Sequence, residues 1–363
     1  MKISYLDLIH SFSSNFINVD FLAIAISPWH ALGIDAELIR DEYQERKGIV
    51  LIAPHPKDGY IITASDFKID INNNIQIFYL SEFREGYKFI LRMKSICIAL
   101  LKINKNKKIL SLICPYEPYT PFLSLFLDKK IHQKRYPCFV LIDEGIGTYS
   151  SNSAWETVAE IDYPQRNMPL FRKYFSNFIN KILYFRIPIK NKFLFKNENG
   201  SLVLNEEIAK NYVRRLGSVQ NVTSDSKIAI VVTQPFSENN SVTLENEMIA
   251  INLIIDLIYS YKIFIKPHPR ENIKKYLSLS KKNIVLLENS KPIEEIIIKM
   301  SPNIIVGYTS TSLMVANALY NVKSYSAVEM LLPFINNDKI KKILLEQYIL
   351  MKNHVLNIKD IKN

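Results

Sequence analysis

Short apolar runs alternate with amphipathic stretches along most of this 363-residue chain, and this alternation restricts the fold more than any other feature. Strand-length runs separated by helix-length stretches predict βαβ units and a parallel sheet. The pattern occurs in both halves of the chain, so two sheets are expected. The predicted strands are 21–26, 48–53, 75–80, 109–114, 139–142, 227–232, 263–265, 284–287 and 303–306, and the predicted helices are 31–40, 87–102, 244–261, 293–300 and 312–320.

The length of the chain exceeds that of a typical single domain and favours two. We therefore predict an α/β fold of the GT-B class, with two Rossmann-like domains and a cleft between them. The first domain covers residues 1–205 and ends in a basic, aromatic linker, with seven basic and no acidic residues over 172–196. The second covers residues 206–335. Residues 336–363 are expected to form C-terminal helices that pack back on the first domain.

Composition limits the functional classes. A hydrophobic content of 48% is ordinary for a globular protein, and no apolar run approaches the ~18 residues needed to cross a bilayer. The N-terminus lacks the features of a signal peptide, so we expect a cytoplasmic protein. Three cysteines without a CxxC pair favour neither disulfides nor a zinc site. The net charge of +11 favours an anionic partner, which can be a polyanion, a membrane face or a substrate.

Two ionisable groups follow predicted strands directly. Asp143-Glu144-Gly145 ends the run 139–142. In open α/β sheets, ligands bind at the carboxyl ends of strands, so one of these two acids is expected to face a ligand, where a carboxylate can act as a base. Gly145 allows a tight turn and a close approach of the backbone to a ligand. Two solvated loop acids are the alternative interpretation.

The second group is His268, which lies between Pro267 and Pro269 at the end of the run 263–265. The prolines stiffen the loop and orient the imidazole. Lys266 and Arg270 add positive potential, which suits a ligand that carries a phosphate. A second Pro-His-Pro at 54–56 lacks these flanking cations and is the weaker candidate.

Four hydroxyl residues, Thr309 to Ser312, stand between the strand 303–306 and the helix that follows. Their hydroxyls and the free N–H groups of the helix form a natural phosphate site, although capping alone needs only one of them. Glu294 opens the helix 293–300, where a carboxylate either complements the helix dipole or accepts the hydroxyls of a ribose. Thr233-Gln234 and Ser27-Pro28-Trp29-His30 end other strands and are candidate cleft walls.

Metal motifs are missing from the sequence, which contains no DxD, HxxH or CxxC. A transferase built on these residues is therefore expected to need no metal and no other cofactor. Side chains and a helix dipole would balance the phosphate charge in place of a divalent ion.

The ordered set Asp143-Glu144-Gly145, His268-Pro269 and Ser310-Thr311 resembles the D/E-D/E-G, HP and S-S/T motifs of bacterial sialyltransferases of the lipooligosaccharide sialyltransferase and polysialyltransferase type. Ser27-Pro28-Trp29-His30 and Thr233-Gln234-Pro235 look similar as well. The resemblance covers roughly residues 20 to 320. The pairs Thr309-Ser310 and Thr311-Ser312 stay open as alternative registers for the third motif.

The resemblance implies an inverting, metal-independent glycosyltransferase that transfers sialic acid from CMP-sialic acid to a glycan acceptor, such as a capsule, lipooligosaccharide or polysialic acid chain. Asp143 would deprotonate the acceptor, and His268 would stabilise or protonate the departing phosphate. The donor-binding residues would be Gly145, Thr233, Gln234, Lys266, Pro269, Glu294, Ser310 and Thr311. The acceptor would be lipid-linked, and the basic segments are suited to contact with an anionic inner membrane. Ordinary amphipathic packing with solvated lysines is the alternative interpretation of these segments.

Three alternatives remain at this stage. The nearest is another metal-independent GT-B transferase, with CMP-Kdo or a UDP-sugar as donor. A non-catalytic nucleic-acid-binding protein would explain the positive charge, but the sequence contains no recognised RNA- or DNA-binding module. An inactive GT-B scaffold fits poorly with intact base and acid candidates.

Overall fold

A computed structural model of the chain describes residues 2–3, 20–40, 43, 46–53, 61–68, 74–80, 111–115, 138–151, 153–154, 157, 189–218, 227–279, 284–288 and 292–361. The chain divides into two compact units. One comprises Met1–Glu144, Met168–Phe193 and Lys210–Arg215, and the other comprises Gly145–Asn167, Leu194–Ala209 and Leu216–Asn363. We call them the first and the second unit.

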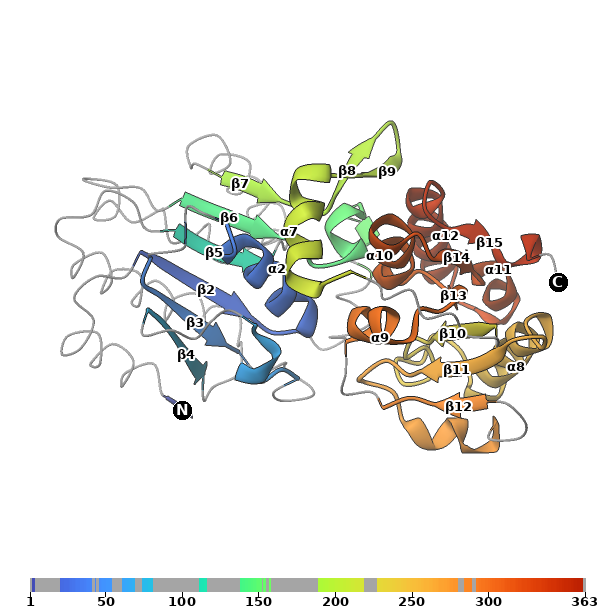
Figure 1. Cartoon of the computed structure of the whole chain (residues 1–363). Coiled ribbons are helices and arrows are strands. Elements are labelled where there is room, and N and C mark those ends of the chain that lie inside the picture. The colour runs from blue at the N-terminus through green and yellow to red at the C-terminus, as the bar shows by residue number, and fades with distance from the viewer. Residues whose placement is uncertain are drawn as a thin grey trace. The chain divides into compact units, whose positions relative to one another are not determined.

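A seven-stranded parallel sheet forms the first unit (Figure 1). Its central strands are buried at every position, which explains why their sequences are continuous apolar runs and not alternating ones. The strands are, in order across the sheet, β1 (Lys2–Ile3), β4 (Ile75–Leu80), β3 (Gly48–Ile52), β2 (Phe21–Ala25), β5 (Ser111–Pro115), β6 (Cys138–Ile142) and β7 (Ile189–Lys192).

Helix α2 (Pro28–Leu38) follows β2 and packs against β2, β5 and β6. Its start is encoded locally, since the Ser27 hydroxyl accepts a hydrogen bond from the His30 N–H and Pro28 occupies the first turn. Ala31 and Ile34 enter the core of this unit together with Val50. The helix therefore begins at the carboxyl edge of the sheet, where the predicted ligand site lies.

The second unit contains a six-stranded sheet that is also entirely parallel (Figure 1). Its order across the sheet is β12 (Ile284–Leu286), β11 (Lys262–Lys266), β10 (Ile228–Val232), β13 (Ile304–Gly307), β14 (Lys323–Ser326) and β15 (Leu356–Asn357). In the register, Val232 lies opposite Lys266, so the loops that follow β10 and β11 leave the sheet side by side.

Helices cover this sheet. Apolar residues of α8 (Leu244–Leu257), α11 (Val328–Leu331) and α12 (Asp338–Met351) share one core with alternate residues of β10, β11 and β13. Helix α10 (Thr311–Tyr320) packs against β13, β14 and α9 (Ile293–Met300). The strand–helix alternation along the sequence thus produces the expected layered α/β unit.

The remaining elements connect the sheets. Strands β8 (Phe195–Glu198) and β9 (Ser201–Leu204) form an antiparallel hairpin in the second unit, followed by α7 (Glu206–Leu216), whose residues Lys210–Arg215 belong to the first unit. Helix α12 lies against β9, and Asn353 just beyond it donates a hydrogen bond to the Leu202 carbonyl. That the C-terminal helices also pack on the first domain stays a prediction, as do the domain boundaries.

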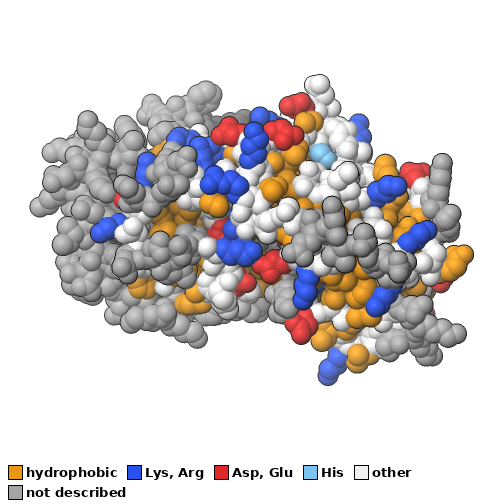
Figure 2. Space-filling view, viewed as in Figure 1, with side chains coloured by type: hydrophobic (Ala, Val, Ile, Leu, Met, Phe, Trp, Pro, Cys, Tyr) orange, Lys and Arg blue, Asp and Glu red, His pale blue; other side chains and the backbone are white. Residues whose placement is uncertain are grey.

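The expected strands are present with shifts of one or two residues at their ends, and the expected α/β class is confirmed. The expected helix 87–102 lies outside the described residues. Among the helices that the structure describes, none combines the length and the apolar character needed to cross a bilayer. On the face shown in Figure 2, basic, acidic and apolar side chains are interspersed over the described residues, without the continuous basic stripe typical of a nucleic-acid-binding face.

Candidate functional site

The first motif lies at the carboxyl end of β6 in the first unit. Asp143 is fully buried, whereas the Glu144 side chain keeps 24% of its surface exposed. The Nε2 atom of His30 on α2 lies 2.7 Å from the Glu144 carboxylate. The two acids of the motif therefore have different environments, and His30 pairs with the second of them.

His30 is a site residue that the sequence marked only as part of a candidate cleft wall. It is 2% exposed, and its Nδ1 accepts a hydrogen bond from the Ile26 N–H at 3.2 Å. A nitrogen that accepts carries no proton, so the neutral ring carries its proton on Nε2, which faces Glu144. The pairing fixes the side chain of Glu144 next to Asp143 in the chain.

Gly145 and Ile146 belong to the second unit, where they meet the third motif. The Ile146 N–H donates a hydrogen bond of 2.6 Å to Thr311 Oγ1. Gly145 adopts a φ of +100°, and a Cβ at this position would lie 2.7 Å from the same hydroxyl. Both the backbone conformation and the close approach require glycine here. The chain that directly follows the acidic pair is thus in contact with the hydroxyl loop.

The hydroxyl loop between β13 and α10 has two buried and two accessible members. Thr309 and Ser312 are buried, and the Thr309 N–H donates to Gln234 Oε1. Ser310 and Thr311 remain partly exposed, with Ser310 as the N-cap of α10. Because α10 begins at Thr311, its free N–H groups open at the same point.

The His268 loop follows β11. The Arg270 N–H donates to His268 Nδ1 at 3.2 Å, which leaves Nε2 as the protonated nitrogen of the neutral ring. The backbone N–H of His268 donates to Glu271 Oε2. Pro269 is exposed, and His268 is partly exposed. The loop therefore has a fixed backbone and a fixed ring, and its surface is formed by the His-Pro pair.

Three carboxylates, those of Glu238, Glu247 and Glu271, converge below this loop within 4.8 Å of one another. The ammonium group of Lys275 lies 3.0 Å from Glu238 and 2.9 Å from each of the other two. A lysine thus occupies the position that a cation would take, and the cluster is a closed ionic network.

Lys266 and Glu294 are further buried ionisable residues of this unit, and each influences the charge of the other. Burial lowers the pKa of Lys266 to about 8, although the charges of Glu294 and Glu271 oppose this shift. Burial raises the pKa of Glu294 to about 7, against the charge of Lys266 and a hydrogen bond with Ser312. Thr233 is buried too, and its hydroxyl donates to Glu271 at 2.6 Å. These predicted donor-binding residues have partners inside the protein.

The structure brings Gly145, Thr311 and Ser310 together at the start of α10, with Gln234 bonded to the same loop. His268, Lys266 and Thr233 lie together around the ends of β10 and β11. Asp143 belongs to the first unit and His268 to the second. The second Pro-His-Pro, at 54–56, lies outside the described residues.

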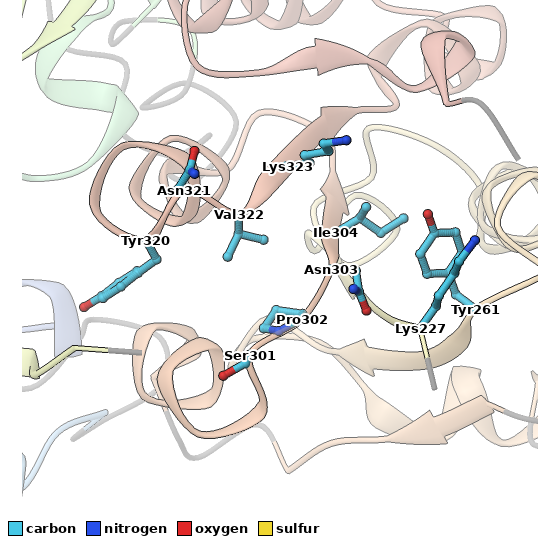
Figure 3. Close-up of a pocket in the computed structure, with 10 residues that line it drawn as sticks. All are labelled: Lys227, Tyr261, Ser301, Pro302, Asn303, Ile304, Tyr320, Asn321, Val322 and Lys323. Carbon is cyan, nitrogen blue, oxygen red and sulfur yellow. The ribbon is translucent and has the colours of Figure 1, made fainter. Parts of the chain in front are cut away.

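A surface hollow of the second unit is distinct from all these groups. Its lining includes Lys227, Tyr261, Asn303, Tyr320 and Lys323 (Figure 3). Lys227 and Asn303 precede β10 and β13, and Lys323 begins β14, so the hollow lies at the amino ends of these strands. The candidate residues follow the carboxyl ends.

Comparisons with known proteins give a family match and several similar folds. The family model of alpha-2,8-polysialyltransferases (POLYST) matches residues 21–329, a range that contains all three motifs. A comparison with curated proteins gives no match. Among solved structures, the chain is similar to the S. aureus MnaA–UDP co-structure, with 8% identity, a TM-score of 0.53 and 92% of each chain covered.

A second solved structure is an alpha/beta-galactoside alpha-2,3-sialyltransferase from Photobacterium phosphoreum, with 12% identity and a TM-score of 0.49 over 94% of this chain and 100% of that one. At such identities, structural likeness concerns the fold alone. Together with the two parallel sheets, the likeness to MnaA confirms the predicted GT-B fold.

Proposed function

The chain belongs to the alpha-2,8-polysialyltransferase family, and from this membership we propose that it transfers sialic acid from CMP-sialic acid to a glycan acceptor by an inverting, metal-independent displacement. The observation that carries the proposal is the family match over residues 21–329, which includes the acidic, His-Pro and hydroxyl motifs in order. Sialyltransferase activity follows from the family, whereas the donor and the roles of individual residues are the proposal.

The reaction needs a base and a stabilised leaving group. In the proposed step the Asp143 carboxylate takes the proton of the acceptor hydroxyl, and the hydroxyl oxygen forms a bond to the anomeric carbon of sialic acid. The bond from that carbon to the CMP phosphate oxygen breaks, and its electron pair leaves with the phosphate. A single displacement of this kind inverts the anomeric centre.

The phosphate is the group on which charge develops as the bond breaks. The start of α10 supports a role in holding it, because Ser310 and Thr311 are the two accessible hydroxyls of the loop and the helix N–H groups open beside them. His268 supports the same role with its Nε2–H, which the bond from the Arg270 N–H to Nδ1 selects. Thus His268 acts as a hydrogen-bond donor to the leaving phosphate.

The other donor contacts are proposed from position. Pro269 is exposed beside His268 and is assigned to the cytosine ring. Glu294 is assigned to the ribose, and its bond with Ser312 places it beside the hydroxyl loop. Lys266 contributes positive charge from the end of β11. Thr233 and Gln234 order the neighbouring loops through their hydrogen bonds to Glu271 and the Thr309 N–H. Gly145 lets the chain after Asp143 approach the hydroxyl loop.

Release of CMP from CMP-sialic acid, measured with EDTA present, tests the proposal. Wild type is expected to release CMP only when a lactose-type or sialylated acceptor is present. Asp143→Asn and His268→Asn are expected to lose most of this turnover, by about 100-fold or more, because the first removes the base and the second the imidazole donor to the leaving phosphate. Full activity in both variants would refute the assigned roles.

Donor competition separates the nearest alternatives. If CMP inhibits and UDP does not, the donor is a CMP-sugar, and a comparison of CMP-sialic acid with CMP-Kdo decides between the two sugars. Turnover of a UDP-sugar alone would replace the proposed donor while leaving the glycosyltransferase class intact.

The acceptor is proposed to be a lipid-linked glycan at the inner membrane face. The basic, partly apolar surface of α12 suits contact with such a membrane.

A further inference from the structure

The buried network below His268 contains one residue, Glu271, that contacts both the loop and the network. The Glu271 side chain is fully buried, and its two oxygens have separate partners. Oε2 accepts hydrogen bonds from the Thr233 hydroxyl and the His268 backbone N–H. Oε1 accepts from the Tyr276 hydroxyl at 2.6 Å and lies 2.9 Å from the ammonium group of Lys275.

The turn at His268 contains one of the two side-chain hydrogen bonds of a capping box. In this motif a Glu three residues after the first residue reaches back to its backbone N–H, and a proline follows that first residue favourably. His268 occupies the first position, Pro269 the next and Glu271 the fourth. The Glu271 N–H in turn donates to the His268 carbonyl at 2.9 Å. Two hydrogen bonds between Glu271 and His268 therefore fix the backbone on which the imidazole stands.

The ring itself is fixed from the same turn. Because the turn directs the Arg270 N–H at His268 Nδ1, the ring position and its tautomer depend on the turn that Glu271 closes. If the His268 backbone rotated, this hydrogen bond would lengthen and the ring could carry its proton on either nitrogen. The chemistry of the ring is thus tied to a carboxylate that bonds to the His268 backbone.

We propose that Glu271 is the positioning residue of His268: its buried carboxylate holds the loop so that the imidazole presents Nε2–H to the leaving phosphate. This inference rests on the proposed function for its role in transfer, but the tautomer and the loop geometry can be examined without any donor. Glu271 acts through His268 and is not a catalytic residue.

The Glu271 carboxylate faces two hydroxyl donors, a backbone N–H and an ammonium group. An ionised carboxylate accepts at both oxygens, whereas a protonated one would place a donor against donors. Lys275 supplies the compensating positive charge, and although burial acts to lower the pKa of Lys275, the charge of Glu271 and the bond to Glu247 raise it overall. Burial also raises the pKa of the Tyr276 hydroxyl, with the Glu271 charge adding to the shift, so Tyr276 remains a donor.

Glu271→Gln is the informative substitution, because the amide has one acceptor and one donor end. The ammonium group of Lys275 can only donate, so the amide oxygen is expected to face Lys275 and Tyr276. Its NH2 group then faces Thr233, whose hydroxyl can turn to accept, and the His268 N–H, which cannot. The substitution therefore breaks the loop anchor selectively and retains side-chain volume.

Glu247→Gln is the matched control. Glu247 is equally buried and lies 2.9 Å from Lys275, but its other partner is the Ser237 N–H and not the His268 loop. Any effect of weakening the ionic network is shared by both variants. An effect on His268 alone is confined to Glu271→Gln.

The first readout is the 15N spectrum of the histidine rings in full-length protein, with the His268 signal assigned by its loss in His268→Asn. Wild type and Glu247→Gln are expected to show His268 in the Nε2–H tautomer, and Glu271→Gln is expected to show a mixture.

The second readout is CMP release. Glu271→Gln is expected to lower kcat about 10- to 100-fold with a smaller change in KM, as for a displaced catalytic group. Glu271→Asp, which keeps the charge but shortens the reach, covers the case in which Glu271→Gln does not fold and is expected to lower kcat by less.

An unchanged His268 tautomer in Glu271→Gln, or an equal loss of kcat in Glu247→Gln, would overturn the inference. The tautomer measurement is independent of the donor. If wild type showed no turnover of CMP-sialic acid but the tautomer shifted as expected, the proposed function would fail while the positioning of His268 by Glu271 would stand.

Discussion

Gly145 shows, at the scale of single residues, how one backbone position joins two motifs. Its φ of +100° and the 2.7 Å that would separate a Cβ from Thr311 Oγ1 make it the point where the chain after the acidic pair touches the hydroxyl loop. Only glycine satisfies both conditions. The hydrogen bond from the next residue, Ile146, to Thr311 joins two residues that are 165 positions apart in the sequence.

We expect Gly145→Ala to lower kcat/KM for CMP-sialic acid by about tenfold or more, because the added methyl displaces Ile146 from Thr311. Gly200→Ala is the control. Gly200 also has a positive φ, +80°, but no atom lies within 4 Å of its Cβ position. Both variants pay a backbone strain of about 1–3 kcal/mol, seen in the melting temperature. Equal activity of the two variants would show that the Thr311 contact is unimportant for turnover.

Glu294 gives a prediction on stability against pH. Its pKa rises from an ordinary 4.5 to about 7 on folding, so the native state binds more protons than the unfolded state between these values. Stability therefore falls as the pH rises through this window. Lys266, with a pKa of about 8, stays mostly protonated throughout.

Urea unfolding at pH 5 and at pH 7.5 checks this prediction. Relative to Glu294→Gln, wild type is expected to lose roughly 2–3 kcal/mol of unfolding free energy between the two pH values. Parallel changes in the two proteins would mean that Glu294 does not titrate in this range.

The sequence was enough to predict the candidate residues at strand ends, but not the side chains that bond to them. The strand-end rule selects Asp143, His268 and the hydroxyl loop because it depends only on local order along the chain. The pairing of His30 with Glu144 depends on β2 and β6 lying in one sheet, which no local pattern specifies. Glu271 stands three residues after His268, but its bond to the His268 N–H has no sequence signature, because the capping-box pattern begins with Ser or Thr.

At the scale of elements, α7 is held to the first unit by a buried ion pair. Arg215 near its end pairs with Asp35 of α2 and donates to the Asp66 carbonyl at 2.8 Å. Asp35 also accepts from the Lys68 N–H. The pair is 8% and 2% exposed, so each charge depends on the other for compensation.

Arg215→Met is expected to lower the unfolding free energy by about 3–5 kcal/mol, because it leaves the Asp35 carboxylate buried without its partner. Arg214→Met, on the exposed neighbouring position of the same helix, is expected to change it by no more than about 0.5 kcal/mol. Denaturant unfolding of the three proteins measures both. The double variant with Asp35→Asn should recover part of the loss, and an additive further loss would argue against the ion pair.

Two of the strands that the sequence did not predict, β14 and β15, share a physical cause. Strand β14 carries two serines and a lysine in four residues, and β15 is only two residues long. Neither has an apolar run of its own, and each exists because parallel pairing with the preceding strand of the sheet satisfies its backbone. The buried strands β2, β3 and β10, by contrast, carry their burial in their own composition.

At the scale of the whole molecule, part of the positive charge lies beside exposed apolar residues on one face of α12. Leu345 and Ile349 are 41% and 54% exposed, one turn apart, and exposed lysines at 342 and 352 flank them along the same face. Apolar side chains between lysines are typical of a helix that rests on an anionic bilayer. Helix α8 offers the opposite arrangement, since its exposed Ile249 and Leu253 are flanked by Glu245 and Asp256.

This pair of helices allows a sharp test of membrane contact. We expect the protein to sediment with vesicles that contain phosphatidylglycerol and not with phosphatidylcholine alone. Replacing both lysines, in Lys342→Glu with Lys352→Glu, should weaken the partitioning by about 2 kcal/mol or more, at about 1 kcal/mol per cation. Ile249→Ser with Leu253→Ser on α8 should leave it unchanged. Both double variants alter exposed positions only. If the lysine variant partitioned onto the vesicles as strongly as wild type, α12 would be excluded as the contact surface. Any binding would then come from the charge of the remaining chain.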